Sequence, residues 1–130
     1  MAMNTATKTT AQPAIDNAVK FSVLSYYKHH FVSFMKEMDK LDEYQRQLEA
    51  ITRREASSQT LMSLLDEESA KHLADDFRFE RECMEQNIAD TGYYLERKCE
   101  KLLAAVAKME EIGLPVEESV INMAKVYINA

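Results

Sequence analysis

This sequence has few of the residues that build turns, sheets and disulfide scaffolds. It contains two Gly, two Pro, two Cys and no Trp among 130 residues. β-Rich domains need turn residues at short and regular intervals, so this scarcity excludes a β-sandwich or barrel. If both cysteines lie on one helix, Cys83 and Cys99 are separated by sixteen residue steps, or about 24 Å, which no disulfide can bridge. We therefore expect two free or buried thiols.

Long apolar runs and clusters of basic residues are also missing. No run approaches the roughly 18 apolar residues of a membrane-spanning helix, and the N-terminus lacks the basic and apolar regions of a signal peptide. The 16 Lys and Arg are outnumbered by 22 Asp and Glu, for a net charge of −6. Binding to phosphates needs clustered basic residues. We expect a cytoplasmic protein with no membrane contact and no direct nucleic acid binding.

The residues that are abundant favour helices. Ala, Glu, Leu, Lys and Met, all strong helix formers, make up much of the chain. The sequence therefore predicts an all-α fold, a long antiparallel helical hairpin resembling a coiled coil with a short C-terminal helix.

Breaks in the pattern divide the chain. The Thr-rich residues 1–12 offer little to bury and predict a disordered tail. The rest, 13–130, is expected to form one helical domain. Its three predicted helices cover about 13–55, about 58–112 and about 115–128.

Punctuating residues support these boundaries. Pro13 suits a first helical turn, and Gly113 suits the end of the second helix, with Pro115 shortly after it. A turn is expected within 55–59, where Ser side chains compete for backbone hydrogen bonds. Gly92 marks a place where the second helix would kink or break at 91–92, and its continuity there is left open.

Large apolar residues recur at alternating three- and four-residue spacing along the first predicted helix. This spacing is typical of the a and d positions of a coiled coil. The seam consists of Leu24, Tyr27, Phe31, Phe34, Met38, Leu41 and Leu48. Such a stripe is buried either in a bundle closed within one chain or between two chains. Of these two arrangements we favour the homodimer.

Negative charge is concentrated in the second predicted helix. Residues 59–112 carry a net charge of −6, whereas 21–58 are neutral. We call eight of its carboxylates the acidic waist: Asp66, Glu67, Glu68, Asp75, Asp76, Glu80, Glu82 and Glu85. A solvated helix face explains most such runs, but a rigid acidic rod can also occupy a basic groove.

Apolar residues lie within and beside the acidic waist. They are expected to contact a partner or the core, and they are Phe77, Phe79, Met84, Tyr93 and Tyr94. Methionine and aromatic side chains suit adaptable protein interfaces.

Catalytic and metal-binding motifs are weak. A di-iron bundle needs Glu-x-x-His on two helices, and this spacing does not occur. One helix face aligns Glu68, His72, Asp76 and Glu80 at four-residue spacing, which could hold a metal only with ligands from another helix. Nearby Glu residues disfavour a reactive thiolate at either cysteine. We expect no cofactor and no enzymatic activity.

The sequence thus predicts a non-enzymatic interaction module, an adaptor, chaperone or inhibitor that binds a protein partner through helical faces. A partner recognised by charge would have a basic surface. One alternative is an acidic inhibitor that mimics nucleic acid through the acidic waist. Another is a metal-dependent carboxylate-bundle enzyme, suggested only by the stripe from Glu68 to Glu80.

Overall fold

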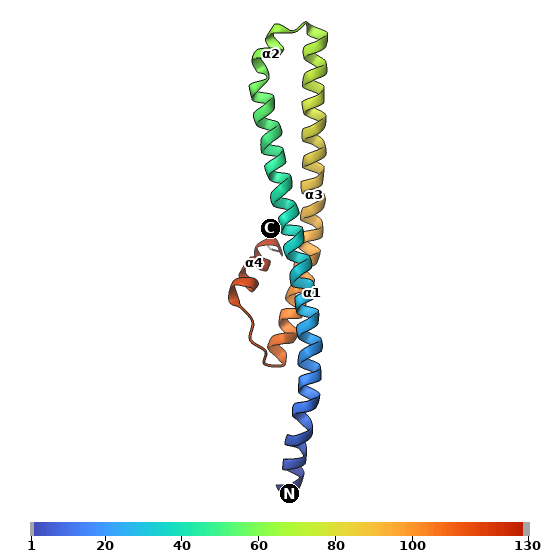
Figure 1. Ribbon diagram of the computed structural model, residues 1–130, viewed down its shortest axis with the longest axis vertical. Coiled ribbons are helices and arrows are strands. Elements are labelled where there is room, and N and C mark those ends of the chain that lie inside the picture. Colours follow the sequence, from blue (N-terminus) through green and yellow to red (C-terminus); the bar gives the residue numbers. More distant parts are fainter. Residues whose placement is uncertain (1, 129–130) are drawn as a thin grey trace. The chain divides into compact units, whose positions relative to one another are not determined.

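The computed structural model describes the backbone of residues 2–128 and the side chains of residues 17–128. Within this range the chain is all-helical, which confirms the predicted fold class. Its elements are α1 (Ala2–Ser57), α2 (Gln59–Leu64), α3 (Glu67–Glu111) and α4 (Glu118–Ile128) (Figure 1).

The chain divides into two compact units, each containing part of α1 and part of α3. The first unit combines Met1–Met35 with Glu96–Ala130, and the second is Lys36–Leu95. The predicted single domain over 13–130 stays a prediction.

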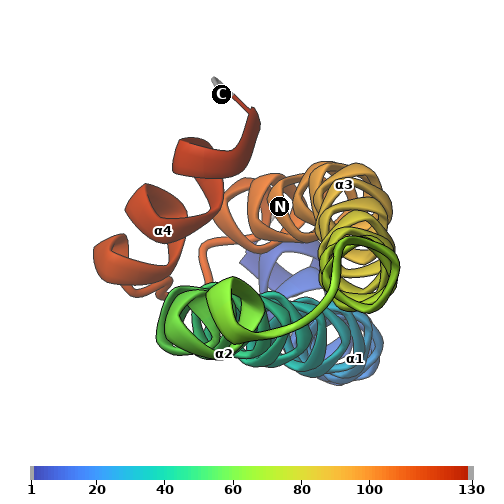
Figure 2. The same cartoon turned by 90° about the horizontal axis from the view of Figure 1, so that it is seen from above.

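The first unit is a packing of three helices. Figure 2 shows α4 beside the parts of α1 and α3 that belong to this unit. Phe34 of α1 is completely buried, and its ring meets that of Tyr127 of α4 edge-on at 5.8 Å between centroids. Its other buried residues line α3 and α4: Cys99, Leu102, Ala105, Val106, Met109, Val120 and Ala124. The short α4 thus covers apolar side chains that two helices would leave open.

The second unit is an antiparallel hairpin in which α2 connects α1 to α3 (Figure 1). Its apolar core holds Ile51, Phe77 and Leu95. Two polar residues, Glu37 and Thr91, are also buried here. Among the described residues no buried side-chain nitrogen or oxygen lacks a hydrogen-bond partner, so this polar content is compensated.

The predicted seam of α1 faces inward to different degrees. Phe34 is buried, and the other six seam residues, Leu24, Tyr27, Phe31, Met38, Leu41 and Leu48, are half-buried. Tyr27 and Phe31, one turn apart, stack with their ring centroids 5.9 Å apart. A coiled coil and a homodimer stay predictions.

The predicted helix over about 58–112 is corrected by a break. α2 ends at Leu64, Leu65 is extended, and α3 begins at Glu67. The cause is Asp66, whose carboxylate oxygen accepts a hydrogen bond of 2.7 Å from the backbone N–H of Ser69. This is an N-cap, and the acidic Glu67 and Glu68 of the first turn favour the helix dipole. The expected turn within 55–59 shrinks to Ser58, between α1 and α2.

The two glycines behave differently. α3 continues through Gly92, so the helix does not end at 91–92. Gly113 has a φ of 78°, and the N–H groups of Gly113 and Leu114 donate to the carbonyls of Glu110 and Met109. This pair of bonds is the Schellman arrangement, which confirms the predicted end of the helix.

The chain ends differ from the prediction in detail. α4 begins at Glu118 rather than near 115, because the left-handed Gly113 and the fixed φ of Pro115 delay the next helix. α1 includes the backbone of residues 2–12, where a disordered tail is predicted. The side chains of 1–16 lie outside the described residues, and the tail stays a prediction.

Candidate functional site

The second unit carries an apolar groove between α1 and α3. Its volume is about 420 Å³. From α1 it is lined by Gln47, Ala50, Ile51 and Arg54, and from α3 by Phe79, Glu80, Cys83 and Met84. This size falls within the roughly 300–1,000 Å³ range of ligand pockets. The groove exists because α1 and α3 share one seam of contacts and leave the side next to it uncovered.

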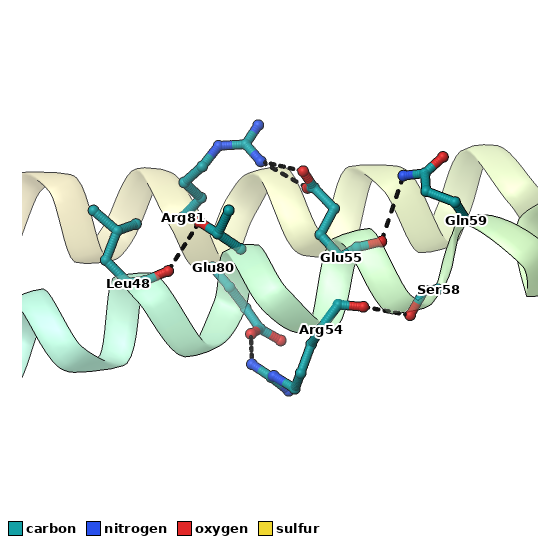
Figure 3. A network of polar contacts seen from close by, with 8 residues as sticks. Leu48, Arg54, Glu55, Ser58, Gln59, Glu80 and Arg81 are labelled. Carbon is teal, nitrogen blue, oxygen red and sulfur yellow. Dashed lines mark hydrogen bonds and ion pairs between the residues drawn. The ribbon is translucent and has the colours of Figure 1, made fainter.

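Two ion pairs join α1 and α3 beside the groove (Figure 3). Arg54 donates from Nη2 to Glu80 at 2.7 Å, and both side chains are largely exposed. Arg81 donates from Nη1 to both carboxylate oxygens of Glu55, at 2.6 and 2.9 Å, and this pair is about two-thirds buried. Beyond them, Ser58 donates its hydroxyl to the Arg54 carbonyl at 2.8 Å (Figure 3). The two ion pairs fix the register of the helices on either side of the groove.

Phe79 is the most unusual residue at the groove. Its side chain lies at the rim and is 68% exposed. Phe77, two residues earlier, points the other way and is buried. Met84 is half-buried and lines the groove. Of the two predicted phenylalanines, therefore, one belongs to the core and the other is exposed at the groove.

Tyr93 and Tyr94 lie on α3, outside the set of residues that line the groove. Both rings are about half exposed, and they meet edge-on at 5.7 Å between centroids. Neither tyrosine therefore belongs to the core: consecutive helix residues point about 100° apart, and here both directions face outward.

The acidic waist is at the surface along its length. Seven of its members are exposed and Asp75 is half-buried. Glu80 pairs with Arg54, Asp75 with Arg78 at 3.1 Å, and Glu68 lies 3.9 Å from His72. Five members have no basic side chain within 4.0 Å in the described part of the chain: Asp66, Glu67, Asp76, Glu82 and Glu85.

The stripe Glu68, His72, Asp76 and Glu80 follows α3 as its spacing predicts. Within the side chains of residues 17–128, no group of three or more His, Cys, Asp or Glu is placed to hold a metal ion. Cys99 is buried, and burial together with Glu100 and Glu96 raises the pKa of its thiol to about 11. Cys83 is exposed at the groove.

Sequence reasoning missed two features of the second unit. One is a group of exposed large apolar residues around the short α2, namely Leu61, Leu64 and Leu65. The other is Glu37, which belongs to no predicted core or site, although it is buried and lies 3.8 Å from Lys40. Its position between the seam residues Phe34 and Leu41 is the signal that could have identified it.

The first unit has its own polar edge. Tyr26 and His30 meet edge-on with ring centroids 4.3 Å apart, and Lys108 lies 6.0 Å from the centre of the Tyr26 ring. Burial, together with the nearby charges of His29 and Lys101, lowers the pKa of His30. Burial and Glu117 raise the pKa of Tyr27.

Comparisons with known proteins give no relative. No protein-family model, curated protein or solved structure matches the chain. Among the described residues, no helix combines the length and the apolar composition of a membrane span.

Proposed function

We propose that this chain is a non-enzymatic interaction module that binds a protein partner through the groove between α1 and α3. The observation that carries the proposal is Phe79, a large aromatic side chain held 68% exposed beside a groove of about 420 Å³. A buried aromatic anchor surrounded by near-neutral contacts is the usual centre of a protein interface.

The rigidity of the groove also supports this role. The Glu55–Arg81 pair, which is about two-thirds buried, and the core residues Ile51 and Phe77 hold both helices of the groove in place in the free chain. Few side chains of the groove therefore lose conformational freedom when a partner binds, which lowers the entropic cost of association.

In the test, a photo-crosslinker is attached to Cys83 at the groove. The labelled protein is then added to an extract of the cells that naturally make it and is irradiated. We expect an adduct with a protein partner, and we expect Phe79→Ser to abolish it. Phe21→Ser is the matched control, because Phe21 is also exposed, at 73%, but belongs to the first unit. No adduct, or an adduct unaffected by Phe79→Ser, contradicts the proposal.

A homodimer is the assembly we propose for the α1 seam. Six of its seven residues are only half-buried, so part of their surface stays available to a second copy. Sedimentation equilibrium should give twice the 15.0 kDa chain mass, and a monomer at micromolar concentration contradicts this assembly.

The acidic nucleic-acid mimic is a second candidate function. It is favoured by the five carboxylates of the acidic waist that have no basic side chain within 4.0 Å in the described part of the chain. A mimic binds through its electrostatic field, so Phe79→Ser should leave its binding to the partner intact. The double variant Asp76→Asn with Glu82→Gln should weaken that binding. Nucleic acid should compete with the chain for the same partner. The groove proposal expects the opposite response to Phe79→Ser.

A further inference from the structure

The surface around Phe79 combines an apolar anchor with negative charge. On a helix, side chains three and four residues apart are neighbours, so Phe79 is surrounded along α3 by Asp75, Asp76, Glu82 and Cys83. Asp75 is paired with Arg78. Asp76 and Glu82 are exposed and have no basic partner in the described part of the chain. An incoming group therefore meets an exposed ring beside two uncompensated carboxylates.

The charge of the whole second unit points in the same direction. Lys36–Leu95 contains fifteen Asp and Glu against eight Lys and Arg, whereas the rest of the chain has a small net positive charge. The one basic residue of the groove wall, Arg54, already binds Glu80 at 2.7 Å. A second copy that presented this same surface would bring like charges together, which is unfavourable. A basic partner is attracted instead.

The groove walls determine the shape of that partner. Both walls are helices, whose backbone groups are bonded internally, so no strand edge is offered to an extended peptide. A third helix packs naturally into the space between two helices. From Gln47 to Arg54 the groove spans about two helical turns, or about 10 Å. This length suits apolar residues at positions i, i+3 or i+4, and i+7 of a bound helix.

We infer that the groove of the second unit binds a basic amphipathic helix of a partner protein. The apolar stripe of that helix packs against Phe79, Ile51 and Met84, and its flanking Lys or Arg side chains pair with Asp76 and Glu82. This inference rests on the proposed function and adds the chemistry of the partner.

Two synthetic helices of about 18 residues, or about five turns, are the probes. One has Leu at helical a and d positions with Lys elsewhere, and the other has Glu in place of every Lys. Fluorescence anisotropy measures their binding to the full chain. We expect binding of the Lys peptide and none of the Glu peptide, because only the Lys peptide complements the carboxylates beside Phe79.

Variants separate this site from general attraction to an acidic protein. Phe79→Ser should weaken binding of the Lys peptide by at least about 10-fold, as expected for a central aromatic anchor. Phe21→Ser, in the first unit, should bind as the unchanged chain does. Asp76→Asn with Glu82→Gln should weaken binding by about 2- to 30-fold, the range expected for two exposed ion pairs. Circular dichroism verifies that each variant keeps its helicity.

The exposed thiol of Cys83 reports where the peptide binds. Because Cys83 lines the groove and Cys99 is buried, labelling by a maleimide should occur at Cys83 and slow when the Lys peptide is bound. The inference is overturned if both peptides bind equally. It is also overturned if the Lys peptide binds but Phe79→Ser does not weaken its binding and the bound peptide does not slow the labelling of Cys83. If the free chain is a dimer in which Cys83 does not react with the maleimide, the groove is occupied by a second copy of the chain, and the inference is overturned.

These outcomes are separate from those of the proposed function. If the Cys83 crosslinker captures a partner in a Phe79-dependent manner but the Lys peptide does not bind, the interaction module stands and its basic helical ligand is rejected. If the crosslinker captures nothing, the module itself is rejected.

Discussion

Arg81 of α3 reaches across the hairpin to Glu55 of α1, and its Nη1 lies 2.6 and 2.9 Å from the two carboxylate oxygens. Both side chains are only about one-third exposed to solvent, Arg81 at 32% and Glu55 at 28%. The neighbouring Arg54–Glu80 pair joins the same helices but is more exposed: the side chain of Arg54 is 59% exposed and that of Glu80 is 45% exposed. Burial reduces screening by water, so the two pairs form a natural comparison of ion-pair strength.

We predict that the Glu55–Arg81 pair is more strongly coupled than the Arg54–Glu80 pair. Exposed pairs contribute about 0.2–1 kcal/mol, and we expect Arg54–Glu80 in that range and Glu55–Arg81 above about 1 kcal/mol. Double-mutant cycles with alanine, measured by urea unfolding, give each coupling energy. Added salt should reduce the Arg54–Glu80 coupling more. Equal couplings would show that the difference in burial has no effect.

A second prediction concerns two seam phenylalanines of the first unit. Phe34 is fully buried against Tyr127, whereas Phe31 is half-buried and stacks on Tyr27. Truncating a buried Phe costs about 3–5 kcal/mol, so Phe34→Ala should lose that much stability and Phe31→Ala less. Thermal unfolding of both variants tests the order. A larger loss for Phe31→Ala would indicate that Phe31 is covered by a second copy.

The sequence predicts the helices of this chain well because they depend on local signals. Periodic apolar residues locate α1, and Gly113 locates the end of α3. The start of α3 escaped prediction, although Asp66 followed by two Glu is a recognisable N-cap. The reason is that the Ser residues near 57–58 offered a competing signal, and only the tertiary structure shows which one reverses the chain.

The candidate site was less predictable, because its properties depend on which side of α3 a residue occupies. Phe77 and Phe79 look alike in the sequence, yet one is buried and the other exposed. The acidic waist is predicted as one set, whereas Glu80 pairs with Arg54 across the two helices, and Asp76 and Glu82 have no basic side chain within 4.0 Å among the described residues. Such pairing joins residues 26 positions apart, which no local pattern records.

A third prediction contrasts the two glycines. Gly92 lies within α3 with no positive φ, and a methyl group added there would meet no atom within 4 Å. Gly92→Ala should therefore raise the stability by about 0.4–1 kcal/mol through helix propensity and a less flexible unfolded chain.

Gly113→Ala should have the opposite sign. Its φ of 78° lies in the left-handed region, where a side chain costs about 1–2 kcal/mol, although space around it is also open. Differential scanning calorimetry of the two variants should show melting temperatures shifted in opposite directions. Shifts of the same sign would contradict the assigned conformations.

The last prediction concerns the buried thiol of Cys99. Burial raises its pKa from an ordinary 9.0 to about 11, with Glu100 and Glu96 contributing in the same direction. Between these values the unfolded chain loses the thiol proton and the folded chain keeps it. Folding therefore binds a proton in this window, and the stability contributed by Cys99 is complete below about pH 9 and is lost as the pH rises through about 11.

Urea unfolding from about pH 8 to about pH 11 measures this contribution by comparison with Cys99→Val, which has no titrating thiol and a similar volume. We expect the stability of the unchanged chain to fall more steeply with pH than that of the variant. Lys and Tyr residues also titrate in this range, but they are common to both proteins, so the difference isolates Cys99. Thiol labelling provides an independent reading, because near pH 8 Cys83 should react in the folded chain and Cys99 only after unfolding. Parallel stability curves, together with rapid labelling of Cys99 in the folded chain, would contradict its burial in the core of the first unit.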